Sequence, residues 1–303
     1  MMQVIKPLVS RKRRLVCLWL LAFAFTLFSF SVRAESVGMA WEVSKQGKSV
    51  TLLGSVHFAD SSFYPLSKSI MSAYERSKKL VVEVDEGRMP VERVRSLLVQ
   101  YGEYPPGRSI YDDLKPETIA LVENLLAEFE LDLEALKNQR PGRLAVTITA
   151  LQAMSLGYSA EQGLDRYFIQ KTRYRKPIEA IESLESQLSL LEQVASDPEV
   201  LHTSFENMQS YAQQWQLTMD AWKSGDEEAL YEGTLGGALK RYPDLAPYFE
   251  LLFYQRHPQM LGVIERCVDE DEACFVVVGA GHVIGPRGLL EDLSNKGYSV
   301  KRL

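Results

Sequence analysis

The fold is decided by the stretch Cys274-Phe275-Val276-Val277-Val278-Gly279-Ala280-Gly281-His282, an apolar run that ends in a Gly-x-x-His motif. A short apolar run bounded by glycine is typical of a strand buried on both faces. The same order occurs near the other end of the chain, where Val50-Thr51-Leu52-Leu53 precedes Gly54-Ser55-Val56-His57. In each copy a helical pattern and a further strand follow. The chain therefore contains one unit twice: strand, Gly-x-x-His, loop, helix, strand.

The two motif histidines are predicted to converge. With 19 Gly and 4 His among 303 residues, a random order of this composition gives fewer than one Gly-x-x-His match. We expect Gly54 and Gly279 to let the backbone turn sharply off each strand end, which presents His57 and His282 at the carboxyl edge of the sheet. If the two strands adjoin, both imidazoles face one cleft.

Two glutamates are predicted to reach the same cleft. Glu83 lies in the expected strand Leu80-Val81-Val82-Glu83-Val84, where an unpaired charge would be costly. Glu182 follows a short extended piece, Pro177–Ile181, and precedes a helix. Each has a structural alternative: Glu83 pairs with a nearby arginine, and Glu182 caps the helix that follows it.

The remaining pattern predicts an α+β fold. Residues from about 90 to 175 are helical in pattern, a long amphipathic helix follows Asp197-Pro198, and another runs from Asp244 to Cys267. We expect a central mixed sheet, built from the two repeats at the chain ends, with a large helical insertion between them. Residues 35–303 are predicted to form a single domain, because no low-complexity linker divides them.

Residues 1–34 are predicted to be a signal peptide. Arg11-Lys12-Arg13-Arg14 precedes an apolar run from Leu15 to Phe30, and Val32-Arg33-Ala34 has small residues at the spacing that signal peptidase prefers. Cleavage after Ala34 makes the protein periplasmic or secreted. The alternative is an uncleaved membrane anchor, in which case the protein meets the membrane only through this segment.

The charge balance argues against nucleic acid as a partner. The whole chain has a net charge of -6, but residues 1–34 contain six basic residues and no acidic one. The remaining residues contain 28 Lys and Arg against 40 Asp and Glu, so their net charge is -12. An acidic body repels phosphate backbones.

Two cysteines, Cys267 and Cys274, remain after export. In an oxidising compartment they are predicted to pair with each other and to close a small acidic loop. A metal site built from these thiols is disfavoured, because no histidine lies within a few residues of them.

Common catalytic motifs are missing from the sequence. It contains no His-Glu-x-x-His, no Gly-x-Ser-x-Gly and no phosphate-binding loop ending in Lys-Ser or Lys-Thr. The segment from Gly279 to Gly285 is similar to a dinucleotide loop, but its third glycine comes one position late.

The motifs together resemble the TraB/PrgY/GumN family. The resemblance rests on the paired Gly-x-x-His motifs, on Glu83, on Ile181-Glu182-Ser183 followed by Glu185-Ser186-Gln187-Leu188, and on the Arg256 region. It covers about residues 38–303 and is nearest to the GumN-like bacterial branch. The family includes the Tiki membrane-anchored proteases and is similar to the ChaN and erythromycin-esterase-like fold.

The resemblance implies metal-dependent hydrolase chemistry. It makes His57 and His282 the paired motif histidines and Glu83 the strand glutamate. Glu182 matches the second glutamate of the family, and Arg256 matches the arginine of an Arg-Asn pair.

The chain departs from the family pattern at His257, which follows Arg256 where asparagine is expected. Its place beside Arg256 leaves a role in the site open. The next residue, Pro258, is expected to perturb the helix from Asp244 to Cys267.

These residue types have a chemistry of their own. His57, His282 and Glu83 form a three-ligand set with an open position, at which a divalent metal polarises water or a carbonyl. Glu182 can accept a proton, and Arg256 can stabilise negative charge on the substrate. Mixed His and carboxylate ligation suits zinc, manganese or cobalt, and the Tiki resemblance favours manganese or cobalt. The alternative is that each histidine only pins a loop to the sheet.

Two functions follow from this interpretation. The first is an exported metal-dependent hydrolase, in its favoured form a peptidase, acting on a peptide or small molecule. The second is a non-catalytic protein that sequesters a peptide or small ligand in the same cleft. Convergence of two histidines with carboxylates favours the enzyme, whereas the altered Arg256-His257 position favours the binder. Haem capture, by analogy with ChaN, rests on fold analogy alone.

Overall fold

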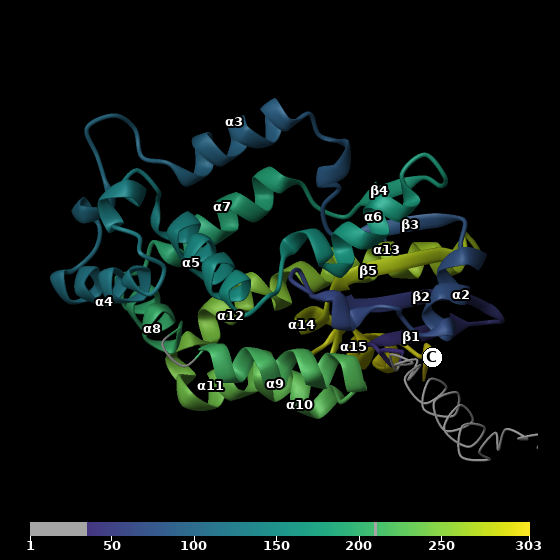
Figure 1. The fold of residues 1–303 in the computed structure, drawn as a ribbon. Coiled ribbons are helices and arrows are strands. Elements are labelled where there is room, and N and C mark those ends of the chain that lie inside the picture. The colour runs from purple at the N-terminus through teal and green to yellow at the C-terminus, as the bar shows by residue number, and fades with distance from the viewer. Residues whose placement is uncertain (1–34, 209–210) are drawn as a thin grey trace, which may run out of the picture. The chain divides into compact units, whose positions relative to one another are not determined.

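Six strands form one mixed sheet with the order β4-β3-β5-β2-β1-β6. The computed structural model describes residues 35–208 and 211–303, and Figure 1 shows the sheet beside a large group of helices. The predicted α+β class is confirmed. The strands are β1 (Ala40–Lys45), β2 (Lys48–Ser55), β3 (Lys79–Val82), β4 (Ile178–Ala180), β5 (Cys274–Gly279) and β6 (Ser299–Arg302).

The two Gly-x-x-His units adjoin at the centre of the sheet. β2 and β5 pair in parallel, with Gly54 opposite Val278 and Ser55 opposite Gly279. β3 pairs in parallel with β5 on one side and with β4 on the other. Four neighbouring strands therefore end at the same edge of the sheet.

β1 is an element that the sequence pattern did not predict. Gln46 and Gly47, with φ of 52° and 80°, make the tight turn that joins β1 to β2 as a hairpin. β1 also pairs antiparallel with β6, so it separates the last strand of the second unit from β2. The last strand of the first unit, β3, instead pairs directly with β5. The repeat is thus local, and the sheet around it is not symmetric.

The described residues form α-helices, short 3-10 helices and one π-helix. The α-helices are α2 (Lys68–Arg76), α3 (Val91–Gly102), α4 (Pro116–Ala127), α5 (Pro141–Ser155), α6 (Leu164–Thr172), α7 (Leu184–Ala195), α8 (Pro198–Met208), α9 (Tyr211–Ser224), α10 (Glu227–Tyr231), α11 (Gly237–Arg241), α12 (Ala246–Leu252), α13 (His257–Asp269), α14 (Ala280–Val283) and α15 (Leu289–Asn295). The 3-10 and π segments are η1 (Ser61–Phe63), η2 (Glu86–Arg88), η3 (Ile110–Asp112), η4 (Leu133–Leu136), η5 (Ala160–Gln162), η6 (Glu232–Gly236, a π-helix), η7 (Pro243–Leu245) and η8 (Tyr254–Arg256).

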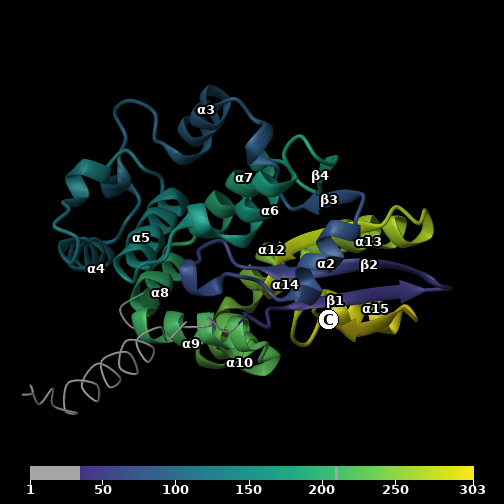
Figure 2. The ribbon, with the colours of Figure 1, turned by 45° about the vertical axis from the view of Figure 1, so that its right-hand side comes forward.

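Helices cover both faces of the central strands. β5 is buried from Cys274 to Val278, as expected for a strand enclosed on two sides. Tyr74 of α2 and Phe168 of α6 both pack on Phe275, with ring centroids 5.6 and 4.9 Å from its own. Buried side chains of α13 belong to the same core, and Figure 2 shows α2 and α13 on opposite sides of the strands.

The helical insertion has a core of its own. Figures 1 and 2 show α3, α4, α5, α7 and α8 together, beyond the end of the sheet at which β2 ends. Buried side chains from several of these helices meet, among them Val122, Leu125, Ile148 and Phe205. The insertion therefore faces the carboxyl edge of the parallel strands.

The predicted helix from Asp244 to Cys267 is wrong in its extent. Pro258 does not bend a continuous helix, because it occupies the first turn of a new one, α13, where its missing N–H removes no helical hydrogen bond. α12 ends at Leu252, and η8 joins the two. Arg256 and His257 consequently lie at a junction between helices.

The two motif glycines, Gly54 and Gly279, do not make the sharp backbone turns that were predicted. Neither Gly54 nor Gly279 has a positive φ. A Cβ atom at Gly54 would lie 3.2 Å from the Cα atom of Ala280, and one at Gly279 would lie 3.2 Å from Oε1 of Glu83. Glycine therefore allows close packing at the strand ends rather than an unusual backbone conformation.

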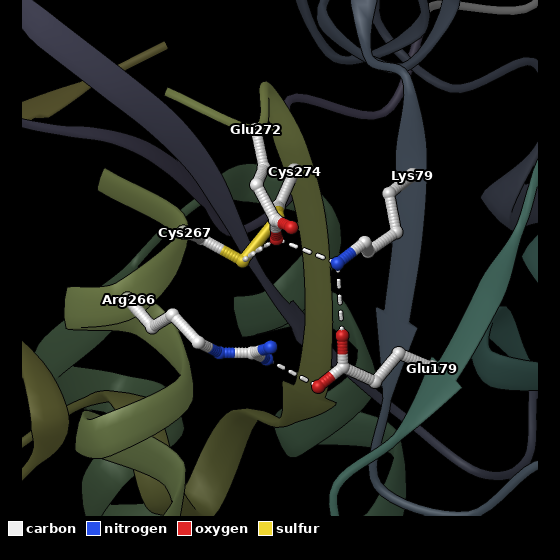
Figure 3. The surroundings of a disulfide bond; sticks show 6 residues. All are labelled: Lys79, Glu179, Arg266, Cys267, Glu272 and Cys274. Atoms are coloured by element: carbon white, nitrogen blue, oxygen red, sulfur yellow. Dashed lines mark hydrogen bonds and ion pairs between the residues drawn. A yellow bond between two sulfur atoms is a disulfide. The ribbon is translucent and has the colours of Figure 1, made fainter. Parts of the chain in front are cut away.

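The predicted disulfide between Cys267 and Cys274 is present. It joins the end of α13 to the start of β5, with the two Cα atoms 6.0 Å apart. Figure 3 shows Glu272 beside the sulfur atoms and bound to Lys79, with Nζ to Oε2 at 2.6 Å. The ligand atoms of Cys267, Glu272 and Cys274 lie close together, but the sulfurs bond to each other and offer no thiolate to a metal.

The predicted signal peptide, residues 1–34, lies outside the described residues. Within the part of the chain that the structure describes, none of the helices combines the length and the apolar character needed to cross a membrane. Residues 35–303 form one compact unit.

Substituting Gly54→Val is expected to destabilise the chain by about 2 kcal/mol, because the added atoms meet the backbone of Ala280. Gly262→Ala is the matched control, since a Cβ there meets nothing within 4 Å. It should stabilise α13 by about 0.5–1 kcal/mol. Urea unfolding measures both, and equal effects of the two substitutions would contradict the packing role of Gly54.

Replacing both Cys267 and Cys274 by alanine is expected to lower the free energy of unfolding by about 2–3 kcal/mol, because the disulfide no longer restricts the unfolded chain. Unfolding of the wild type in a thiol reductant should give the same loss. A wild-type stability that does not respond to reductant would show that the pair does not form in the protein.

Candidate functional site

The predicted site residues follow four neighbouring parallel strands. His57 comes after β2, His282 after β5, Glu83 after β3 and Glu182 after β4. Because the carboxyl ends of parallel strands meet at one edge, residues distant in sequence come together there. Glu83 itself lies one residue beyond β3 and not within the strand, where the sequence pattern had placed it.

Arg256 is the residue to which the others bind. Its Nε donates to Oε1 of Glu182 at 2.8 Å, and Nη2 donates to Oε2 of Glu182 at 2.7 Å and to Oε2 of Glu83 at 2.6 Å. Its Nη1 donates to the Leu252 carbonyl at 3.0 Å and to Nε2 of His282 at 2.8 Å. A guanidinium has five N–H groups. All five are used within the protein, so in this structure Arg256 has none left for a substrate.

Glu83 is a buried carboxylate that hydrogen bonds keep charged. Its Oε1 accepts from the Gly279 backbone N–H at 2.6 Å, and its Oε2 accepts from Gln187 Nε2 at 3.1 Å in addition to Arg256. Burial alone would raise the pKa of Glu83, but the Arg256 guanidinium and the Gly279 N–H hold it well below its usual range. The alternative that Glu83 pairs with a nearby arginine is therefore correct as geometry, and that arginine is Arg256.

Glu182 does not cap α7. The N-cap is Ser183, whose hydroxyl accepts from the Ser186 N–H at 3.1 Å. The Glu182 carboxylate instead binds Arg256 in a bidentate manner and accepts from Gln187 at 3.2 Å. We call Glu83, Glu182, Gln187, Arg256 and His282 the Arg256 cluster.

His282 is a neutral imidazole in the Arg256 cluster. Its side chain is only 4% exposed. Burial lowers the pKa of His282 to about 3, although the charge of Glu83 opposes the shift. A guanidinium can only donate, so Nε2 of His282 is the acceptor and the ring proton lies on Nδ1.

His57 binds a different carboxylate. Its Nδ1 lies 3.1 Å from Oδ2 of Asp165, and Oδ1 of Asp165 accepts from the Ser55 hydroxyl at 2.8 Å. The His57 side chain is 68% exposed. It is nevertheless near enough to Glu83 that a positive charge on a protonated His57 ring would lower the pKa of Glu83.

The first turn of α6 fixes the backbone of His57. The Leu164 N–H donates to the Val56 carbonyl at 3.0 Å. The N-cap Gly163 lies against the His57 carbonyl, and any Cβ atom there would overlap it. The close contact between Gly163 and the His57 carbonyl, which only glycine allows, therefore places Asp165 beside His57.

The three predicted metal ligands do not form a compact donor set. Among residues 35–208 and 211–303, no group of His, Cys, Asp or Glu that includes His57 or His282 brings three ligand atoms within 4.8 Å of one another. The Nε2 lone pair of His282 and one oxygen of Glu83 already accept from Arg256. This arrangement does not fit a divalent ion bound by His57, Glu83 and His282 together. Metal dependence stays a prediction.

Two members of the site, Asp165 and Gln187, were not predicted from the sequence. An acidic residue in the first turn of a helix stabilises the helix through its dipole. The sequence therefore contains no signal that distinguishes a functional Asp165 from a structural one. Gln187 lies in the motif Glu185-Ser186-Gln187-Leu188, but a glutamine on a helix does not by itself indicate a functional role. Only the fold shows that Asp165 faces His57 and that Gln187 bridges two carboxylates.

Comparison with known proteins identifies relatives of the chain. Residues 39–302 match the model of the TraB/PrgY/gumN family. Two curated relatives, the uncharacterized protein YbaP of Escherichia coli K12 and that of Shigella flexneri, are each 23% identical over 144 residues, or 47% of this chain and 52% of theirs. The chain thus spans about half the length of the curated relatives that it matches. No solved structure matches it.

Acid is expected to destabilise the protein through its buried imidazoles. Burial lowers the pKa of His282 in the folded state and that of His257 as well. The unfolded chain then binds more protons below about pH 6.5, so the stability present above that pH is lost as the pH falls. The loss should approach about 1.4 kcal/mol per pH unit for each imidazole that stays neutral.

Urea unfolding between about pH 7 and pH 5, where most carboxylates remain ionised, measures this slope in the presence of a chelator. His282→Gln removes one of the two buried imidazoles and should flatten the slope. A slope that is the same in the variant and the wild type would show that His282 is not the neutral, buried group described above.

Proposed function

The chain belongs to the TraB/PrgY/gumN family, and from that membership we propose that it is an exported hydrolase of peptide-like substrates. The observation that carries the proposal is the His57–Asp165 pair. It lies at the carboxyl edge of the sheet, as does the Arg256 cluster. Ligands of open parallel sheets bind beyond this edge.

His57 is the proposed general base. Asp165 accepts from Nδ1–H of His57, so the lone pair of the neutral ring lies on Nε2, the nitrogen that would take a proton from a water molecule. An imidazole oriented by a carboxylate is the arrangement that hydrolases on unrelated folds use for this step. The 68% exposure of the His57 side chain gives water access to it.

The Arg256 cluster is proposed to position groups and not to touch the substrate. The guanidinium N–H groups bind Glu83, Glu182, His282 and Leu252, so the stabilisation of substrate charge that the sequence suggested for Arg256 would require the cluster to open. In the proposed role the cluster fixes the loops that follow β3, β4 and β5 around His57.

A cavity of about 440 Å³ is proposed to receive an apolar side chain of the substrate. Its lining includes Tyr231, Pro247 and Tyr254. Tyr254 lies in the same short helix as Arg256, and its ring is 5.6 Å from that of His257. Aromatic and proline surfaces of this kind suit a hydrophobic group.

Export belongs to the proposal as well. The basic and apolar pattern of residues 1–34 is typical of a signal peptide. The disulfide between Cys267 and Cys274 supports an oxidising compartment, because such bonds are rare in the cytosol. We therefore propose a periplasmic or secreted location.

A second candidate function is sequestration of a peptide or small ligand without turnover. The saturated guanidinium favours it, because a site that keeps Arg256 fully paired has less to offer a developing oxyanion. The two functions share the same edge of the sheet and differ in whether His57 accepts a proton.

Hydrolysis of a peptide library by the purified exported chain tests the proposal. His57→Ala is expected to lower kcat/KM by about 100-fold or more, because it removes the general base. Asp165→Asn should lower it less, since the base remains but loses its orientation. His202→Ala is the matched control: His202 binds Thr118 in the helical insertion, outside the site.

The outcomes separate the two functions and the metal. Equal background activity in the wild type and His57→Ala would overturn the hydrolase and leave sequestration, which calorimetry with the same peptides then measures. Activity lost in a chelator and restored by manganese, cobalt or zinc would establish metal dependence. Activity unchanged by the chelator would show that the metal prediction is wrong.

A further inference from the structure

His257 packs against His282 inside the protein. The ring centroids are 5.4 Å apart and the planes meet at 65°. Both residues are only 3% exposed. His257 is the residue that departs from the family pattern, and it begins α13 directly after Arg256.

Each ring has one nitrogen without a hydrogen-bond partner. In His282 this atom is Nδ1, and in His257 it is Nε2; both are buried. A buried polar atom that makes no hydrogen bond is costly and rare in native proteins. Two such atoms on neighbouring rings point to an interaction between them.

The protonation of the two rings is complementary. Arg256 donates to Nε2 of His282, so the neutral ring carries its proton on Nδ1. Nδ1 of His257 lies 3.8 Å from Oδ2 of Asp292, and the charge of this carboxylate favours a proton on that nitrogen. The neutral His257 ring therefore has its proton on Nδ1 and its lone pair on Nε2, the nitrogen that has no partner. The two unpartnered atoms are therefore one N–H donor and one lone pair.

We propose that His257 is a positioning residue of the site, whose Nε2 accepts the Nδ1–H of His282 through one buried water, since the two nitrogens do not bond directly in this structure. This contact fixes the His282 ring with Nε2 toward Arg256. The contact also gives the departure from the family pattern a chemical meaning, because an asparagine side chain would likewise present an acceptor oxygen to His282. The effect on turnover rests on the proposed hydrolase, whereas the contact itself does not.

The ¹⁵N NMR spectrum of the labelled, exported chain tests the contact without a substrate. We expect His282 to show a protonated Nδ1 and an unprotonated Nε2. In His257→Leu the Nδ1 proton should exchange with water about tenfold faster, because its buried hydrogen bond is lost. His257→Asn should restore slow exchange. A coupling between the two ring nitrogens would indicate a direct bond, and slow exchange without it would indicate a bridging water.

Two results would overturn the proposal: a His282 proton on Nε2, or an exchange rate in His257→Leu equal to that of the wild type. His202→Leu is the matched control, because it removes another partly buried histidine and should leave the His282 signals unchanged. Far-ultraviolet circular dichroism of each variant verifies that it is folded.

Kinetics then distinguish failure of this proposal from failure of the proposed function. In an active hydrolase, His257→Leu should lower kcat about tenfold with little change in KM, because it disturbs a positioned group and not the binding surface. His257→Asn should recover most of kcat. If no hydrolysis is found, the NMR result still decides the contact. If hydrolysis is found and His257→Leu leaves kcat unchanged, His257 does not position the site.

Discussion

The five hydrogen bonds of the Arg256 guanidinium are the interaction on which the rest of the site depends. They join groups that follow three different strands, because Glu83 comes after β3, Glu182 after β4 and His282 after β5. A guanidinium is planar and carries its donors in a fixed fork, so these acceptors are fixed relative to one another. Removing one partner would leave the others buried and unpaired, which costs more than the bond itself contributes.

The site consists of two parts with opposite exposure. The Arg256 cluster is buried and its hydrogen bonds are internal, whereas the His57 side chain is 68% exposed and is oriented by Asp165. A rigid, buried part beside an accessible base is an arrangement that suits hydrolysis. The same arrangement suits a binding protein if the base is never used, and this is why the distinction depends on His57 and not on the cluster.

The sequence predicted the central architecture because it repeats a local pattern. Two apolar strands, each followed by Gly-x-x-His, indicated a shared sheet edge, and β2 and β5 are indeed parallel neighbours. β1 was not predicted, because Glu42 and Lys45 interrupt its apolar run. The Gln46-Gly47 turn places it beside β2. The junction at Pro258 was misjudged because a proline inside a helical pattern and a proline at a helix start look alike in sequence.

Local pattern and composition were enough to place each Gly-x-x-His motif after a strand, to show the acidic body of the chain, and to assign His57, Glu83, Glu182 and His282 to one sheet edge. Which of these residues pair follows from the three-dimensional fold. It placed Glu83 and Glu182 on one arginine, paired His57 with Asp165, and set His257 against His282. Such pairings depend on which strands are neighbours and on where helices begin, and long-range geometry of that kind leaves no mark on the local sequence.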